Sequence, residues 1–102
     1  MEPSLTGLFG LNREMGYTRR EFFAKLPAAL SDYAFAVNDD VVTIKVGTGE
    51  VKLHVGVESE RRLSALVSFP VLPVTIECTD VDPSSQANFI RRFETAYFNG
   101  LG

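Results

Sequence analysis

Between residues 41 and 79, apolar and polar side chains alternate along several consecutive runs, and this period of two limits the possible folds more than any other feature. The run 50–58 is the clearest, with Val51, Leu53, Val55 and Val57 on one side and Lys52, His54, Gly56 and Glu58 on the other. Such alternation is typical of a strand with one face buried and the other in water. We therefore expect strands at 33–37, 41–46, 50–58, 63–69 and 69–79.

Two amphipathic helices flank these strands. Thr18 and Glu21 form a capping-box pattern for the first helix, in which Pro27 predicts a kink or a break. Asp82 followed by Pro83 marks the start of the second helix. Each helix has one apolar stripe. The order α-β-β-β-β-β-α predicts a two-layer α+β sandwich, with both helices on one face of an antiparallel meander sheet. Pro70 and Pro73 place the last strand at an edge or after a bulge.

The N-terminal segment 1–17 is expected to be irregular. Three glycines disfavour a helix there, but Leu5, Leu8, Phe9 and Leu11 disfavour a free tail. We expect this segment to pack on the body of a single domain, 1–102, or on a second subunit. A chain of 102 residues has room for one core.

No constellation for catalysis, metal or cofactor binding is found. Alternation places His54 on the polar face of the sheet and Cys78 on the apolar face, so they cannot form a nucleophile and base pair. Asp80 and Asp82 begin a stretch like a calcium loop, but that stretch lacks the required glycine and final glutamate. We expect no enzyme, no metal and no cofactor.

Composition bounds the partners and the compartment. The net charge of −3 does not favour nucleic acid, although the pairs Arg19/Arg20, Arg61/Arg62 and Arg91/Arg92 could form a local patch if they converge. The N-terminus resembles neither a signal peptide nor a membrane span, so we expect no membrane partner. A single cysteine favours the cytoplasm.

Six residues are candidates for interaction with a partner. Phe98 lies off the apolar stripe of the last helix, on the same side as Arg91, and Leu101 follows it. Aromatic residues and arginines are enriched at interface centres. Phe9 belongs to the apolar N-terminal segment, and Leu66 and His54 are expected on the outer face of the sheet.

The function predicted from these residues is a non-catalytic interaction or accessory module that associates with itself or with another protein. The alternative is a binder of a small apolar ligand between a curved sheet and the C-terminal helix, which rests on fold-level analogy. An enzyme built from carboxylates or from a site shared between subunits has no residue to support it.

Overall fold

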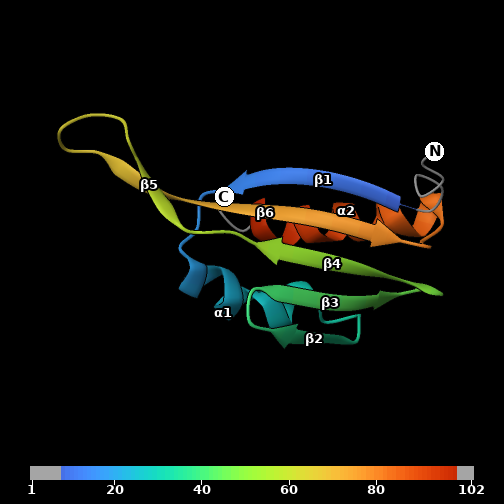
Figure 1. Ribbon diagram of the computed structural model, residues 1–102. Helices are drawn as coiled ribbons and strands as arrows, with labels where there is room; N and C mark the ends of the chain where they lie inside the picture. The colour runs from blue at the N-terminus through green and yellow to red at the C-terminus, as the bar shows by residue number, and fades with distance from the viewer. Residues whose placement is uncertain (1–7, 99–102) are drawn as a thin grey trace.

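The computed structural model describes residues 8–98, apart from the side chains of Leu8 and Phe9, and shows an open α+β fold (Figure 1). In this part of the chain two helices accompany six strands: β1 (Leu8–Met15), α1 (Arg19–Ala29), β2 (Phe35–Asn38), β3 (Val41–Val46), β4 (Gly49–Val55), β5 (Ser59–Arg62), β6 (Ser68–Thr79) and α2 (Pro83–Phe98). The predicted two-layer arrangement with both helices on one face of an antiparallel sheet is confirmed.

The strands are ordered β1-β6-β4-β3-β2, and every pair is antiparallel. The short strand β5 lies off this path and pairs with the beginning of β6. The sheet does not close, so β1 and β2 form its two edges. Along β2, β3, β4 and β6 the chain follows the predicted meander.

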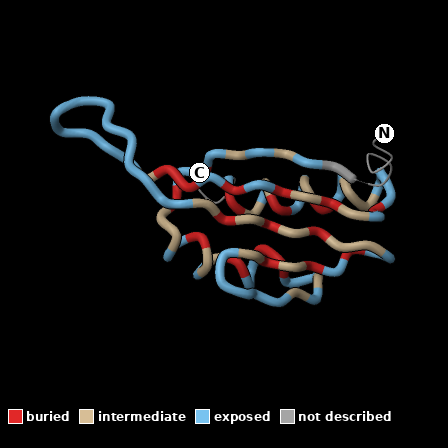
Figure 2. Tube along the Cα trace, viewed as in Figure 1, coloured by how far each residue is buried: buried red, intermediate tan, exposed pale blue. Residues whose placement is uncertain are grey.

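The core lies between the sheet and the helices. β3 and β4 bury every second residue, so Val42, Ile44, Val51 and Leu53 face the helices while their neighbours face outward. Figure 2 shows this alternation along the central strands. The period of two in the sequence therefore predicts correctly which face of these strands is buried.

Helix α1 begins with the predicted capping box. The Thr18 hydroxyl accepts from the Glu21 amide at 3.0 Å, and the Glu21 carboxylate accepts from the Thr18 amide at 2.9 Å. Phe22 and Leu26 are buried on the core side. The expected break at Pro27 is absent, because the helix continues to Ala29. Pro27 is exposed and only two helical residues follow it, so the helix loses little when that amide is missing.

Helix α2 begins at the predicted cap. The Asp82 carboxylate accepts from the Ser85 amide at 3.1 Å and from the Ser84 hydroxyl at 3.0 Å. The hydrogen bonds from Ser85, and then the one from Ser84, hold the pKa of Asp82 below its ordinary value. Further along, Phe89, Phe93 and Tyr97 form the buried stripe.

Two tyrosines tie the ends of the helices together inside the core. The buried Tyr97 hydroxyl donates to the carbonyl of Phe22 at 2.7 Å, and the Tyr17 hydroxyl donates to the carbonyl of Tyr97. Burial, and after it the neighbouring Tyr17, raises the pKa of Tyr97 above its ordinary value. The hydroxyl of Tyr97 is therefore a neutral donor that joins α2 to α1.

We expect Tyr97→Phe to destabilise the protein by about 1 to 2 kcal/mol, because it removes this buried donor and leaves the Phe22 carbonyl without it. Urea unfolding of the wild type and the variant measures the difference. Tyr33→Phe is the control, since the Tyr33 ring is only partly buried against Phe89. Equal losses in the two variants would contradict a specific role for the Tyr97 hydroxyl.

The expectation of an irregular segment over 1–17 is wrong for residues 8–15. These residues form β1, and the whole of β1 pairs with β6, from Leu8 opposite Thr79 to Met15 opposite Leu72. The glycines disfavour a helix in this segment but do not exclude a strand, and Gly10 lies in the edge strand β1. The segment therefore packs on its own domain through β1, and residues 1–7 lie outside the described part.

The expected strand at 63–69 is also wrong. Residues 59–62, which lie between two of the expected strands, form β5, and the chain reverses over 63–67 before β6 begins at Ser68. The two strands make a hairpin that projects from the body, and Figure 1 shows it at the left. We call residues 57–69 the arm.

The prolines predict that the last strand lies at an edge or begins after a bulge, and the first alternative is wrong because β6 is not an edge strand. It pairs with β1 on one side and with β4 on the other. Pairing with β4 ends at Val74, one residue after Pro73, and Pro70 pairs with Glu60 of β5. Because both prolines lie outside the ladder with β4, their missing amides do not interrupt it.

Candidate functional site

The arm is the most exposed part of the described chain. Every residue from Val57 to Phe69 is exposed (Figure 2). Five of the seven large apolar side chains that are exposed in the described range belong to it: Val57, Leu63, Leu66, Val67 and Phe69. The radius of gyration is 14.7 Å, against about 13 Å for a compact domain of this length. The arm therefore carries apolar surface away from the body instead of burying it.

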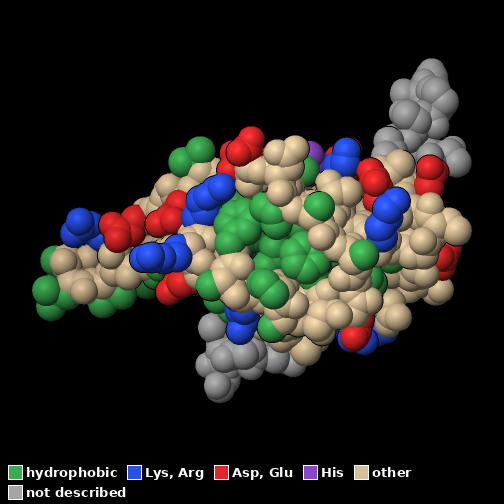
Figure 3. Space-filling model, turned by 90° about the horizontal axis from the view of Figure 1, so that it is seen from below, with side chains coloured by type: hydrophobic (Ala, Val, Ile, Leu, Met, Phe, Trp, Pro, Cys, Tyr) green, Lys and Arg blue, Asp and Glu red, His purple; other side chains and the backbone are tan. Residues whose placement is uncertain are grey.

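A second apolar surface lies at the β2 edge. Phe35 and Val37 are paired with the buried residues Ile44 and Val42, so they point to the helix side of the sheet. Phe35 is partly buried and Val37 is 49% exposed, because the helix layer covers the sheet incompletely here. Figure 3 shows apolar side chains gathered on this underside of the molecule.

Phe23 of α1 is linked to the β2 edge through Arg19. The guanidinium of Arg19 lies 4.9 Å from the centre of the Phe23 ring and also forms an ion pair at 2.5 Å with Asp40, two residues after β2. Phe23 is only partly buried against the core. We call Phe23, Phe35 and Val37 the β2 patch.

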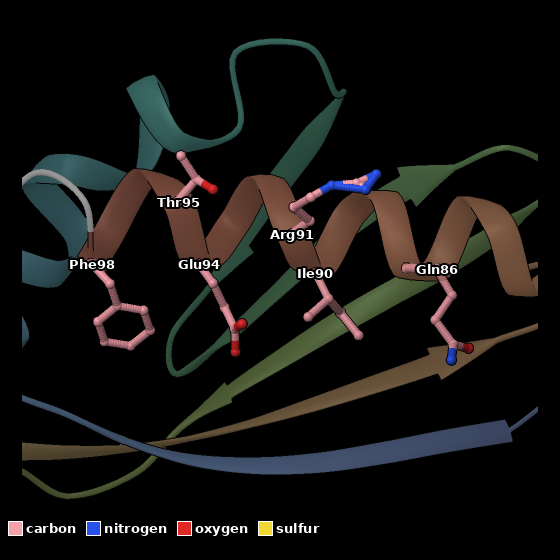
Figure 4. Close-up of a pocket in the computed structure, with 7 residues that line it drawn as sticks. Gln86, Ile90, Arg91, Glu94, Thr95 and Phe98 are labelled. Carbon is pink, nitrogen blue, oxygen red and sulfur yellow. The ribbon is translucent and has the colours of Figure 1, made fainter.

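Phe98 and Arg91 line a shallow groove along α2 with a volume of about 600 Å³. Figure 4 shows Gln86, Ile90, Glu94 and Phe98 projecting to one side of the helix, whereas Arg91 projects away from them. Phe98 is 37% exposed and lies outside the buried stripe, as its helical position predicts. Phe98 and Arg91 therefore border the same groove without forming one cluster.

The groove is polar on the side of β1. The Glu94 carboxylate forms an ion pair at 2.5 Å with Arg13, which joins α2 to β1.

Leu101 lies outside the described residues, and the side chain of Phe9, opposite Cys78 in the β1 and β6 ladder, is not described.

His54 lies on the outer face of the sheet, as predicted, with its Nε2 atom 2.9 Å from the Glu77 carboxylate. Leu66 does not lie there. It is at the end of the arm and 95% exposed, because residues 63–67 are a loop and not a strand of the sheet. His54 and Leu66 therefore belong to different surfaces.

The thiol of Cys78 and the imidazole of His54 lie on opposite faces of the sheet, as the alternation predicts. Cys78 is fully buried among the helix-facing residues, and His54 is half-exposed. Burial, and secondly the Glu77 carboxylate, raises the pKa of the Cys78 thiol, which keeps it protonated at neutral pH. This arrangement cannot act as a nucleophile and base pair.

Between residues 8 and 98, no group of three or more His, Cys, Asp or Glu side chains is placed to hold a metal ion. Neither helix in that range is long and apolar enough to cross a membrane.

The three arginine pairs lie on three separate elements: the start of α1, β5, and the middle of α2. One member of each pair binds a carboxylate: Arg19 binds Asp40, Arg61 binds Glu14, and Arg92 binds Asp32. A neighbouring carboxylate therefore offsets part of the positive charge of each pair.

Side chains fill the space between the sheet and α2. The rings of Phe22, Phe89, Phe93 and Tyr97 pack against one another at centroid distances from 4.9 to 6.4 Å, and all four are buried. The grooves along α2 and between the helices are lined by other residues and include none of these four rings. The core region that would enclose an apolar ligand is occupied by the protein itself.

Comparison with known proteins gives no significant match to a family model, to a curated protein or to a solved structure. Function therefore has to be inferred from the surfaces of this chain.

The sequence named Leu66 as an interaction candidate, but it identified neither the arm nor the β2 patch as an apolar surface. Leu63, Ala65, Val67 and Phe69 alternate like a half-buried strand, but alternation does not say whether a core lies beneath them. One sequence signal indicates an unprotected strand edge at β2: residues 35–38 contain neither a charged residue nor a proline.

Proposed function

We propose that this protein is a non-catalytic interaction module of the cytoplasm that associates with a second copy of itself through the β2 edge. The observation that carries the proposal is the coincidence of an unpaired strand edge with the β2 patch. A partner placed there can continue the sheet and cover apolar surface in the same contact.

The two edges of the sheet differ in a way that supports this choice. Exposed strand edges are usually protected by charges, proline or bulges. Strand β1 carries Arg13 and Glu14, whereas Phe35, Ala36, Val37 and Asn38 of β2 include neither a charge nor a proline. The protection of this edge is limited to the shortness of β2, which has four residues, so a second strand can still pair with it.

A second copy fits this edge by symmetry. When β2 pairs antiparallel with its own copy about a two-fold axis, Phe35 of one copy lies opposite Val37 of the other. Directly opposed residues point to the same face, so the two helix layers lie on one side of a continuous sheet. Both β2 patches then meet near the axis, as an isologous interface requires.

The cytoplasmic location is supported by Cys78. The single cysteine is a buried free thiol, which needs no oxidising compartment.

The expected result is that the wild type sediments as a dimer and Val37→Lys as a monomer, or with a dissociation constant raised at least about tenfold. Lysine places a charge in the apolar contact and on the strand edge. Sedimentation equilibrium over a range of concentrations measures both proteins. Val37 is 49% exposed, so the substitution leaves the core intact.

Leu66→Lys is the matched control, because it makes the same change from aliphatic to lysine at an exposed position of the arm. We expect this variant to remain dimeric. A monomeric wild type at high concentration would contradict the proposal, as would dissociation by Leu66→Lys but not by Val37→Lys.

A further inference from the structure

The end of the arm is an apolar tip. Leu66 is 95% exposed and Leu63 64% exposed, and Val67 lies beside them in the same loop. The remaining loop residues, Ser64 and Ala65, are small. A two-stranded hairpin with such a tip gains little from its own packing, so its apolar residues are explained better by a surface that receives them.

The backbone of the tip is already hydrogen-bonded within the loop. The Ser64 hydroxyl accepts from the amides of Leu66 and Val67, both at 3.2 Å. The amides of Leu63 and Ser64 donate to the carbonyl of Val67, at 2.8 and 3.2 Å. Four amides of the loop therefore need no water as acceptor, which lowers the cost of placing the tip in a medium of low polarity.

The charge nearest the tip is that of Arg62, because the Arg61 guanidinium is paired with the Glu14 carboxylate of β1 at 3.1 Å. Arg61 and Arg62 precede Leu63 directly, and no acidic residue occurs from 61 to 76. The nearest acidic residues in the arm, Glu58 and Glu60, lie on the side of the body. Glu58, Glu60, Arg61 and Arg62 make the arm neutral as a whole, so the net charge of −3 comes from the rest of the chain. Salt screens charges separated by more than about 10 Å at 0.1 M ionic strength.

We propose that the arm docks this protein on an anionic lipid surface, with Leu63, Leu66 and Val67 in the interfacial layer and Arg62 at the headgroups. Apolar side chains together with neighbouring basic residues are the combination that holds peripheral proteins on such surfaces. The cytoplasmic leaflet carries the required negative charge. The sequence predicts no membrane partner because its N-terminus resembles no membrane span. Docking on the surface of a membrane needs no such span.

This proposal is independent of the β2 interface, because it depends on different residues. A lipid surface is favoured over a protein partner for two reasons. The apolar residues occupy the outermost point of a narrow projection, and Arg62, the last residue of β5, directly precedes Leu63.

Cosedimentation with vesicles tests the proposal on the full chain. We expect binding to vesicles of phosphatidylcholine and phosphatidylserine, weaker binding at higher salt, and little binding to phosphatidylcholine alone. Leu66→Ser is expected to weaken binding about tenfold, and Arg62→Gln about fivefold. Val37→Lys, away from the arm, is the control, and circular dichroism checks that each variant is folded.

Three results would overturn the proposal. The first is no sedimentation of the wild type with the anionic vesicles at low salt. The second is binding that is unchanged by both Leu66→Ser and Arg62→Gln. The third is an absence of vesicle binding together with a change of oligomeric state in Leu66→Ser, which would assign the arm to a protein contact.

Discussion

Gly49→Ala is expected to destabilise the protein by about 3 kcal/mol, at the upper end of what one added methyl group costs in a packed site. A Cβ atom at this position would lie 2.3 Å from the carbonyl oxygens of both Thr79 and Asp80. These are backbone atoms at the end of β6, so they cannot rotate away as a side chain would. The variant must separate β4 from β6 at this end or distort the chain. Urea unfolding measures the loss.

Gly10→Ala provides the control for this prediction. Gly10 also lies in a strand of the sheet, but a Cβ atom there meets no atom within 4 Å. We expect its stability to change by less than about 0.5 kcal/mol. If Gly49→Ala were tolerated equally well, the close approach of β4 to the end of β6 would be wrong.

Phe93→Ala is expected to cost about 3 to 5 kcal/mol, which is a large part of the stability of an ordinary domain. Phe93 is buried, and its ring lies 4.9 Å from that of Tyr97, 6.0 Å from that of Phe89, and 6.4 Å from that of Phe22. Removing it leaves a cavity between the two helices and the sheet that these rings cannot fill without leaving their positions.

Phe98→Ala makes the same chemical change five residues later on the same helix. Phe98 is half-exposed at the groove, so we expect a loss of less than about 1 kcal/mol. Thermal or urea unfolding compares the two variants directly. Similar losses would show that α2 does not have the assigned buried face.

The elements that bury one face are the ones that the sequence predicts. Val42, Ile44, Val51 and Leu53 alternate with polar residues, and the helices cover the apolar side. The caps at Thr18 and Asp82 are equally well marked, because each depends on a few neighbouring residues. Local periodicity and local hydrogen bonding are enough to specify these parts.

Long-range pairing is where the prediction failed. Strand β1 is recognised only by its ladder with β6, some 60 residues later in the chain. Residues of the arm alternate like those of a core strand. The sequence does not reveal that the arm lies outside the main sheet, where its only partner strand is the beginning of β6. Residues 63–69 therefore look the same in the sequence whether they are buried or exposed.

In the candidate site, too, the sequence predicts the local features correctly and the long-range ones incorrectly. The sequence identifies Phe98 as lying off the buried stripe, because the helical period is local. It places His54 on the outer face correctly and Leu66 incorrectly, because only His54 belongs to a strand of the main sheet. The β2 patch depends on how far α1 extends over the sheet, and this is a tertiary property that no short segment determines.

Hydrogen exchange at two protein concentrations tests the β2 interface most directly. We expect the outward-pointing amides of Phe35–Asn38 to exchange more slowly at high concentration, because they donate to a second copy there. The amides of β1, at the other edge, are expected to exchange at the same rate in both samples. Equal rates for β2 at both concentrations, or protection gained at β1 instead, would contradict association through this edge.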